Sequence, residues 1–409
     1  MAASTFETLT LPLQKYFEDK GKEIDEQSGS RKFFFKAFTL TMLFAFIKQL
    51  KSLRKIVNFL PLSDEASKLE INPVAFSTLR DGFSRFDNKY FFDLYRYVLT
   101  RVKLLKIRSI DELGLLECVD GSIFPTIGSM EWAEYKKTKN AIRLHVSFSL
   151  NRMIPLEFVG TKANSGERLF LLEIAKKGVT YIADRGYFSF DLAHKLTHTG
   201  AFFVLPIKEN IKYSVGATLN VPENMPNCLM DISHTLIRFD NDKHREIYRM
   251  VKFNVGESSF TLLTNRLDLS VLQIIILYVY RWQVELLFKF IKRVVNGIHL
   301  FNHSKNGVNI QFCLLMILTV LYLNLKQFCF FYGKNETENV NALKDLDALR
   351  LNNIEDFNTY IGYSADLWVN ALNKIFNGLW KISSYWGDNL ATLIAKPFDY
   401  QVINTLASD

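Results

Sequence analysis

Cysteine is scarce in this sequence, which has four among 409 residues, at positions 118, 228, 313 and 329. No two of them form a Cys-x-x-Cys pair, so neither a cysteine zinc site nor a disulfide framework is indicated. Disulfide-built proteins are found mainly in oxidising compartments, and a reducing one is the simplest location for this chain. We therefore predict a cytoplasmic protein.

A hydrophobic run long enough to cross a membrane is also missing. The most apolar stretch, residues 312–323, has 12 residues and is followed by Asn324 and Lys326, whereas a bilayer requires about 20 apolar residues. Residues 1–15 lack the charged-then-apolar pattern of a signal peptide. We interpret residues 312–323 as a buried helix and expect no membrane partner. Binding to an acidic membrane surface is an alternative that the basic charge leaves open.

Acidic residues are absent from residues 31–60, which carry seven Lys or Arg residues among aromatic and aliphatic ones. Gly and Pro rarely interrupt this stretch or residues 73–105, so we expect helices in both, with a separation at Asp81-Gly82. Basic helices with an apolar face suit contact with the DNA backbone; the solvated face of a helical bundle is the alternative. The net charge of +8 favours a polyanionic partner, although a merely basic soluble protein has the same charge.

Material for folded cores is plentiful. Hydrophobic residues make up 48% of the chain and charged residues 22%, as in a folded soluble protein rather than a disordered one. A length of 409 residues is too great for one compact core and favours two or three domains.

The pattern changes at residue 113, where short apolar runs and one alternating stretch indicate strands. Asn164 and Glu167 resemble a helix-capping pair that would open a helix to about residue 177. The order is three strands, then helix, strand, helix and strand, which is that of an RNase H-like α/β core with a mixed five-stranded sheet flanked by helices. The strands are predicted at residues 115–120, 142–148, 154–159, 179–183 and 201–207, and the second helix at 191–199. His145, on the polar side of its strand, is interpreted as structural.

The rest of the chain divides into regions of different residue composition. Polar, turn-rich residues with strand-like runs at 235–239, 246–253 and 259–263 predict an inserted β-rich subdomain. We expect a helical N-terminal DNA-binding region, a core in two parts around the insertion, and a C-terminal helical region. The predicted boundaries are residues 1–112, 113–207, 208–266, 267–333 and 334–409.

The most informative segment is a helix expected over about residues 270–295. One side of this helix carries an apolar stripe, and beside it five polar side chains fall within roughly 80° of arc at about 100° per residue. A single carboxylate therefore lies among four polar partners, three of them cationic. The five residues are Tyr278, Arg281, Glu285, Lys289 and Lys292.

The spacing Tyr-(2)-Arg-(3)-Glu-(6)-Lys, from Tyr278 to Lys292, resembles the signature of bacterial insertion-sequence transposases of family four. Two further pieces of the resemblance lie in the expected order. Asp120 ends the first strand, in Val-Asp-Gly-Ser, and Asp184 ends the fourth, in Asp-Arg-Gly-Tyr. The resemblance implies a DDE transposase with catalytic residues Asp120, Asp184 and Glu285, which would cleave DNA at the ends of its element and join them to target DNA by cut-and-paste transposition.

The resemblance also implies two Mg²⁺ ions, with Mn²⁺ as a substitute, held by the three carboxylates with Asp120 bridging both. Phosphodiester exchange passes through a strongly anionic phosphorus centre, and a pair of metal ions can activate the attacking oxygen and stabilise the leaving one. Carboxylates are the hard oxygen ligands that Mg²⁺ prefers. Water would first release a 3′-OH at the element end, and that hydroxyl would then attack target DNA.

The expected partners are double-stranded DNA, as element ends and as target, and a second copy of the chain bound through residues 334–409, at the bacterial nucleoid. The resemblance places Phe260 where hairpin-forming relatives carry a Trp that stacks on a base. Relatives also carry an Arg at the end of the fifth strand, where this chain has Leu205-Pro206, and Lys208 could replace that Arg. Arg and Lys can bind phosphates and a Tyr hydroxyl can donate to one. The predicted DNA contacts are Tyr278, Arg281, Lys289, Lys292, Phe260, Lys208 and Arg185.

Several alternatives remain at this point. An Asp-Gly at a strand end commonly forms a turn, Arg281 could simply pair with Glu285 on the helix, and Phe260 could pack in a core. The chain as a whole could be a catalytically inactive DNA-binding descendant or an RNase H-type nuclease.

Overall fold

The computed structural model describes residues 5–332, apart from residues 64–65, 68, 70, 103–112, 127–129, 137–138, 209, 224, 226–228, 256–257, 295–296 and 298. The region predicted as the dimer contact, residues 334–409, lies outside the described residues. So does the boundary predicted at residue 112.

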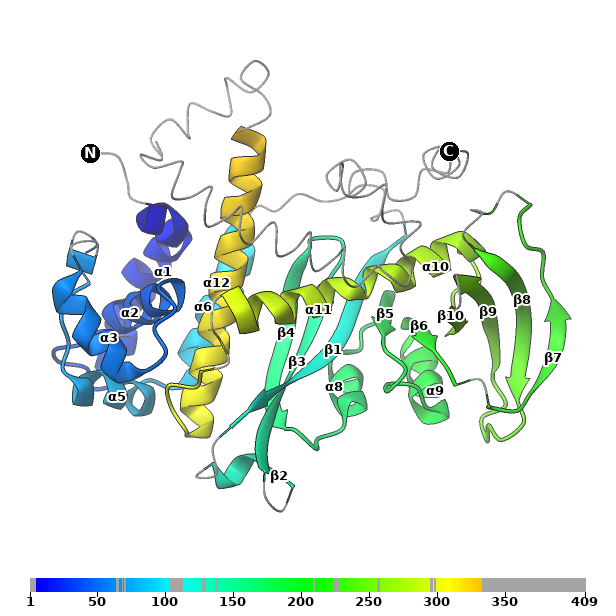
Figure 1. Ribbon diagram of the computed structural model, residues 1–409, viewed down its shortest axis with the longest axis horizontal. Helices are drawn as coiled ribbons and strands as arrows, with labels where there is room; N and C mark the ends of the chain where they lie inside the picture. Colours follow the sequence, from blue (N-terminus) through cyan, green and yellow to red (C-terminus); the bar gives the residue numbers. More distant parts are fainter. Residues whose placement is uncertain are drawn as a thin grey trace.

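Helices form in both N-terminal stretches predicted to be helical (Figure 1). The separation expected at Asp81-Gly82 is wrong, because both residues lie inside one helix and the chain turns at Phe86 instead. A Cβ at Gly82 would lie 2.5 Å from the ring of Phe38, so this glycine permits close helix packing rather than a turn. The helices are α1 (Thr5–Gln27), α2 (Phe35–Ile47), α3 (Leu53–Phe59), η1 (Leu60–Leu62), α5 (Phe76–Arg85) and α6 (Asn88–Arg101).

One mixed sheet runs through the rest of the molecule, and within the described residues it has ten strands in the order β2-β3-β1-β5-β6-β10-β9-β8-β7, with β4 also paired to β3. β1 is antiparallel to β3 and parallel to β5, which is parallel to β6. The strands are β1 (Leu115–Pro125), β2 (Glu134–Lys136), β3 (Lys139–Ser149), β4 (Ile154–Lys162), β5 (Val179–Ala183), β6 (Phe202–Pro206), β7 (Tyr213–Thr218), β8 (Met230–Phe239), β9 (Ile247–Val255) and β10 (Ser258–Thr264).

The prediction of a five-stranded sheet is therefore wrong. Strands of the predicted insertion extend the same sheet, because β10 pairs with the open edge of β6, with Leu263 opposite Leu205. Unpaired backbone groups at a sheet edge favour such an addition. β7 was not expected at all, since its residues are mostly exposed and lack an alternating apolar pattern.

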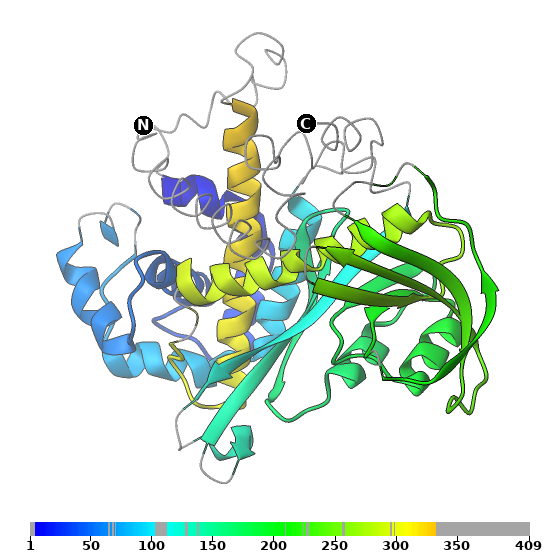
Figure 2. The same cartoon turned by 45° about the vertical axis from the view of Figure 1, so that its right-hand side comes forward.

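Alternation along the central strands creates two hydrophobic cores, one on each face of the sheet. Cys118 of β1 and Ile182 of β5 belong to the core under α10 (Val271–Tyr280) and α11 (Trp282–Lys289). Val119 and Ala183 point to the other core, which packs under α8 (Glu167–Ile174) and α9 (Phe190–Thr199). The helices thus cover opposite faces of the sheet (Figures 1 and 2).

Two predictions about helix ends and continuity need correction. Gly166, not Asn164, precedes α8, and no side chain caps that helix. The helix expected over residues 270–295 is broken: α10 ends at Tyr280, α11 begins at Trp282, and a π-helical turn η3 (Phe290–Val294) follows. At the break the Arg281 amide donates to the Tyr278 carbonyl at 3.1 Å, three residues back rather than four, which tightens the turn.

Ser270 begins α10 with a capping box, in which its hydroxyl accepts from the Gln273 amide at 3.2 Å and the Gln273 side chain accepts from the Ser270 amide at 2.8 Å. We expect Ser270→Ala to lower the free energy of unfolding by about 1 kcal/mol, because it leaves the Gln273 N–H group without its acceptor. Chemical denaturation would measure this loss. Ser259→Ala, at an exposed position of β10, should change stability by less than about 0.5 kcal/mol; equal losses would contradict the capping role.

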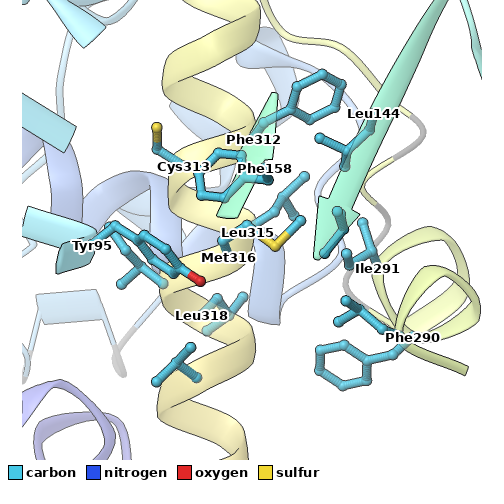
Figure 3. Packing of buried hydrophobic residues seen from close by; sticks show 14 of the residues in the cluster. Tyr95, Leu144, Phe158, Phe290, Ile291, Phe312, Cys313, Leu315, Met316 and Leu318 are labelled. Carbon is cyan, nitrogen blue, oxygen red and sulfur yellow. The ribbon is translucent and has the colours of Figure 1, made fainter. Parts of the chain in front are cut away.

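The helix α12 (Lys305–Tyr332) stands between the N-terminal helices and the sheet (Figures 1 and 2). Its apolar residues pack against Tyr95 of α6, Phe158 of β4 and Ile291 of η3 (Figure 3). Two helical segments, Val271–Lys292 and Lys305–Asn324, are long and apolar enough to span a membrane, but 67% and 78% of their most apolar windows are buried inside the molecule. The prediction of a buried helix at residues 312–323 is confirmed.

Candidate active site

Asp120 lies in β1, and Asp184 directly follows β5, the neighbouring parallel strand. Val119 of β1 lies opposite Ala183 of β5. The residue that follows each of them is an aspartate, so Asp120 and Asp184 lie side by side. Side chains alternate along a strand, and Asp120 therefore shares the face of Cys118, whose thiol lies 3.6 Å from the Tyr280 carbonyl of α10. The Asp120 carboxylate consequently points toward the face covered by α10 and α11, and Asp184 directly follows the end of β5 beside it.

Glu285 comes to this face from α11, which packs on β1 and β3. It lies in the first turn of the helix and is half-buried. The guanidinium of Arg281, one turn earlier, donates from Nη1 to Glu285 Oε1 at 2.8 Å. The ion pair that the sequence offered as an alternative is thus present, and it holds the Glu285 carboxylate in one position above the strands.

The electrostatics of Asp120 show that the three carboxylates lie near one another. Burial raises the pKa of Asp120 to about 7, and the negative charges of Asp184 and Glu285 add to the rise, while the Gly121 amide and Arg281 oppose it. Like charges raise a carboxyl pKa only over short distances. The structure therefore brings together three acidic residues that are 64 and 101 positions apart in the sequence.

Oxygen donors of this kind fit divalent metal ions. Asp120 Oδ1 accepts from the Gly121 amide and Asp184 Oδ1 from the Gly186 amide, each at 2.7 Å. The other oxygen of each aspartate accepts no hydrogen bond within the part of the chain that the structure describes. Carboxylate oxygens oriented by backbone amides match the hard ligands of Mg²⁺, and no sulfur or imidazole atom is among the three predicted ligands.

Cationic and aromatic side chains surround the acidic group. Lys292 Nζ donates to the Ile123 carbonyl at 2.8 Å and lies 4.8 Å from the ring centre of Phe124. Burial lowers the pKa of Lys292, and the charge of Asp120 opposes that change. Burial likewise raises the pKa of Tyr278. Arg281 is 7% exposed, so its guanidinium faces the carboxylates rather than solvent.

The other predicted DNA contacts lie farther out. Arg185 and Lys208 are exposed, and Lys289 is half-buried on α11. Phe260 stacks on Phe253 with ring centres 5.1 Å apart and meets the ring of Tyr278 edge-on at 6.4 Å. Phe260 therefore packs against other aromatic rings, as the alternative interpretation expected. One of these rings is that of Tyr278, which is also a predicted DNA contact.

A second charged group on the opposite face was not identified from the sequence. Arg143 Nη1 donates to Glu167 Oε1 at 2.6 Å, with both side chains about one-fifth exposed. The Tyr187 ring is buried beside them, and its hydroxyl has no partner among the described residues. The position of Arg143 on the polar side of an alternating strand indicated a side chain that could take part in a charged group. Its partner Glu167 was interpreted only as part of a helix cap, so the pair was missed.

We expect the buried His145 to make the stability of the protein depend on pH. It is 1% exposed, its Nε2 lies 2.9 Å from Thr161 Oγ1, and its Nδ1 has no acceptor among the described residues. Burial lowers the pKa of His145 to about 4, from an ordinary value of 6.5. Between these pH values the unfolded chain binds a proton that the folded chain does not, so the free energy of unfolding should fall by about 3 kcal/mol as the pH drops from 6.5 to 4.

Urea denaturation of wild type and His145→Gln across this pH range would measure that contribution. The substitution should flatten the dependence, whereas His303→Gln, at an exposed position, should leave it unchanged. An equal slope for wild type and His145→Gln would contradict the assignment.

Part of the chain is similar to known proteins. Residues 115–321 match the family described as the transposase DDE domain. A Sinorhizobium fredii protein named as a transposase, y4zB, is 26% identical over 51% of this chain and 60% of its own length. A Geobacillus stearothermophilus protein named as a transposase for insertion sequence element IS5377 is 23% identical over 48% of this chain and 53% of its own length. The chain thus spans little more than half of each relative.

Among solved structures, a cryo-EM structure of the piggyBac transposase synaptic complex with hairpin DNA is similar over 86% of both chains. Its sequence identity is 8% and its TM-score 0.41, which is too low a similarity to carry an argument.

Proposed function

This chain belongs to the transposase DDE domain family, and from that membership we propose that it catalyses metal-dependent DNA cleavage at the ends of a bacterial insertion sequence and strand transfer into target DNA. The observation that carries the proposal is the proximity of Asp184 and Glu285 to Asp120, because the charges of these two residues raise the pKa of Asp120. Three neighbouring carboxylates would supply the ligand set that such chemistry requires.

In this proposal Asp120, Asp184 and Glu285 would hold two Mg²⁺ ions, with Mn²⁺ as a substitute. The bound ions would activate the attacking oxygen and stabilise the leaving oxygen in an in-line displacement. Arg281 orients the Glu285 carboxylate through their ion pair at 2.8 Å. The Gly121 and Gly186 amides fix one oxygen of each aspartate, which keeps the remaining oxygen directed toward a ligand.

DNA would enter on the face of α10 and α11. Lys292 lies close enough to Asp120 for the negative charge of Asp120 to act on the Lys292 pKa. In this position the Lys292 ammonium group could bind a phosphate beside the reacting bond. We assign the same role to Tyr278 and Lys289. Arg281 would reach a phosphate only after leaving Glu285. Phe260 would stack on a base after leaving Phe253, and the exposed Arg185 and Lys208 lie outside this inner group.

The remaining organisation follows the same proposal. The chain would use residues 1–112 for DNA binding, residues 113–207 and 267–333 as an RNase H-like catalytic core, residues 208–266 as an insertion, and residues 334–409 for pairing two copies on two element ends. Assignment to family four rests on the Tyr278-Arg281-Glu285-Lys292 spacing. Action in the bacterial cytoplasm, at the nucleoid, is part of this proposal.

Removal of divalent metal tests the reaction. Purified protein should cleave and join labelled element-end DNA in Mg²⁺ or Mn²⁺, and excess chelator should reduce both products by at least about a thousandfold, because the carboxylates alone cannot stabilise the phosphorus centre. Readdition of Mg²⁺ should restore both. Cleavage without joining to a second DNA would identify a nuclease. DNA binding without cleavage in any metal would identify an inactive descendant.

A further inference from the structure

A cluster of imidazole and carboxylate groups lies away from the proposed catalytic carboxylates. His194 and His198 are one turn apart on α9, so their side chains project from the same side of the helix. Glu246 precedes β9, at the end of the turn from β8. Candidate ligand atoms of the three residues all lie within 4.8 Å of one another. Figure 1 shows α9 beside the turn that joins β8 to β9.

The distances fit a small metal ion. His194 Nδ1 lies 3.0 Å and His198 Nδ1 3.9 Å from Glu246 Oε1. Ligands about 2.05 Å from a tetrahedral zinc ion are about 3.4 Å apart, a value between these two. His198 Nδ1 also lies 3.1 Å from the His194 carbonyl, and this contact would be exchanged for the metal.

Neighbouring residues hold the imidazoles in place. The His244 ring stacks on that of His194 with centres 3.7 Å apart and planes 8° apart. His244 Nε2 lies 2.9 Å from Asp191 Oδ1, and the same oxygen accepts from Lys243 Nζ at 2.9 Å. Asp191 therefore offsets the positive charge of Lys243 beside the cluster, and the stacked His244 ring limits the rotation of the His194 ring.

We propose that His194, His198 and Glu246 bind one Zn²⁺ ion, with water as the fourth ligand, and that the ion joins α9 to the β8–β9 turn. Two imidazoles and one carboxylate are a ligand set typical of zinc, whereas the catalytic carboxylates offer oxygen alone. Both His194 and Glu246 are about one-quarter exposed and His198 is 62% exposed, so the ion reaches the site from solvent. The site connects two parts of the chain that the sequence separates by 48 residues.

Calorimetric titration of the full chain with ZnCl₂, in excess Mg²⁺ to occupy the carboxylate site, tests this proposal. We expect one Zn²⁺ per chain, and at least tenfold weaker binding in His198→Ala and Glu246→Gln. His303→Ala, an exposed histidine elsewhere, is the matched control and should bind as wild type does. Asp120→Asn should also bind normally, which separates this site from the proposed catalytic one.

Thermal unfolding provides a second measurement. Zn²⁺ should raise the midpoint of wild type and of His303→Ala by several degrees, because a ligand that binds the folded state stabilises it, and should leave His198→Ala unchanged. His198 is exposed, so equal midpoints without zinc will show that its substitution leaves the fold intact. Unchanged zinc affinity in His198→Ala, no stoichiometric binding to wild type, or loss of binding in Asp120→Asn would each overturn the proposal.

Discussion

Replacing any one of Asp120, Asp184 or Glu285 by its amide should reduce DNA cleavage and strand transfer by at least roughly a thousandfold, or about 4 kcal/mol of transition-state stabilisation. Asn and Gln keep the size of the side chain but remove the charge that would hold divalent metal. Labelled element-end DNA with Mg²⁺ provides the assay, and a gel shift should show DNA binding within a few-fold of wild type.

Stability distinguishes this loss from misfolding. Burial and neighbouring charges raise the pKa of Asp120 to about 7, above its ordinary value, so its charged form is disfavoured in the folded protein at neutral pH. Asp120→Asn should therefore keep or raise the melting temperature while activity disappears. Glu173→Gln, an exposed carboxylate of α8, is the control and should retain full activity. More than one-tenth of wild-type cleavage in Asp120→Asn would be incompatible with the proposed role.

Truncation of Phe312 should cause the largest loss of stability. Its side chain is fully buried in α12, its ring meets that of Phe124 edge-on at 5.3 Å, and Figure 3 shows it among the residues that join α12 to the sheet. Phe312→Ala removes this contact and leaves a cavity, for which we expect a loss of about 4 kcal/mol in the free energy of unfolding. Urea denaturation would measure it.

A matched control for that loss is Phe34→Ala, since Phe34 is 46% exposed and should cost less than about 1 kcal/mol. Phe312→Leu should fall between the two, because it keeps most of the buried volume. If Phe312→Ala and Phe34→Ala were equally stable, α12 would not be the central packing element described above.

The central strands and the order of the acidic residues could be predicted because they depend on local patterns. Residues 179–183 are apolar except for Thr180 and appear as β5, fully buried. The prediction that the first strand ends at Asp120 is wrong, because β1 pairs with β3 as far as Pro125. The parallel partner β5 does end at Ala183, directly before Asp184. The sequence therefore predicted the position at which the pairing of β1 with β5 ends, and Asp120 and Asp184 lie at that position.

Features that depend on contacts between distant segments could not be predicted. The edge of β6 accepts β10, 56 residues later, and no local pattern at either strand specifies that partner. The break at Arg281 lies in a segment without Gly or Pro, so the usual signals were missing. His194 and His198 are visible as a helical pair, but their proximity to Glu246 follows only from the pairing of β9 with β10 and β8.

The β6–β10 pairing has a consequence for how the molecule opens. Val204 of β6 pairs with Ile182 of β5 on one side and with Thr264 of β10 on the other. The strand β6 therefore belongs both to the ladder beside Asp184 and to the ladder of the insertion. Backbone amides on both sides should then exchange with deuterium at similar, slow rates, since neither part can detach without exposing the hydrogen bonds of the other. Movements that admit DNA would have to arise in the helices above the sheet while the strands beneath them stay closed.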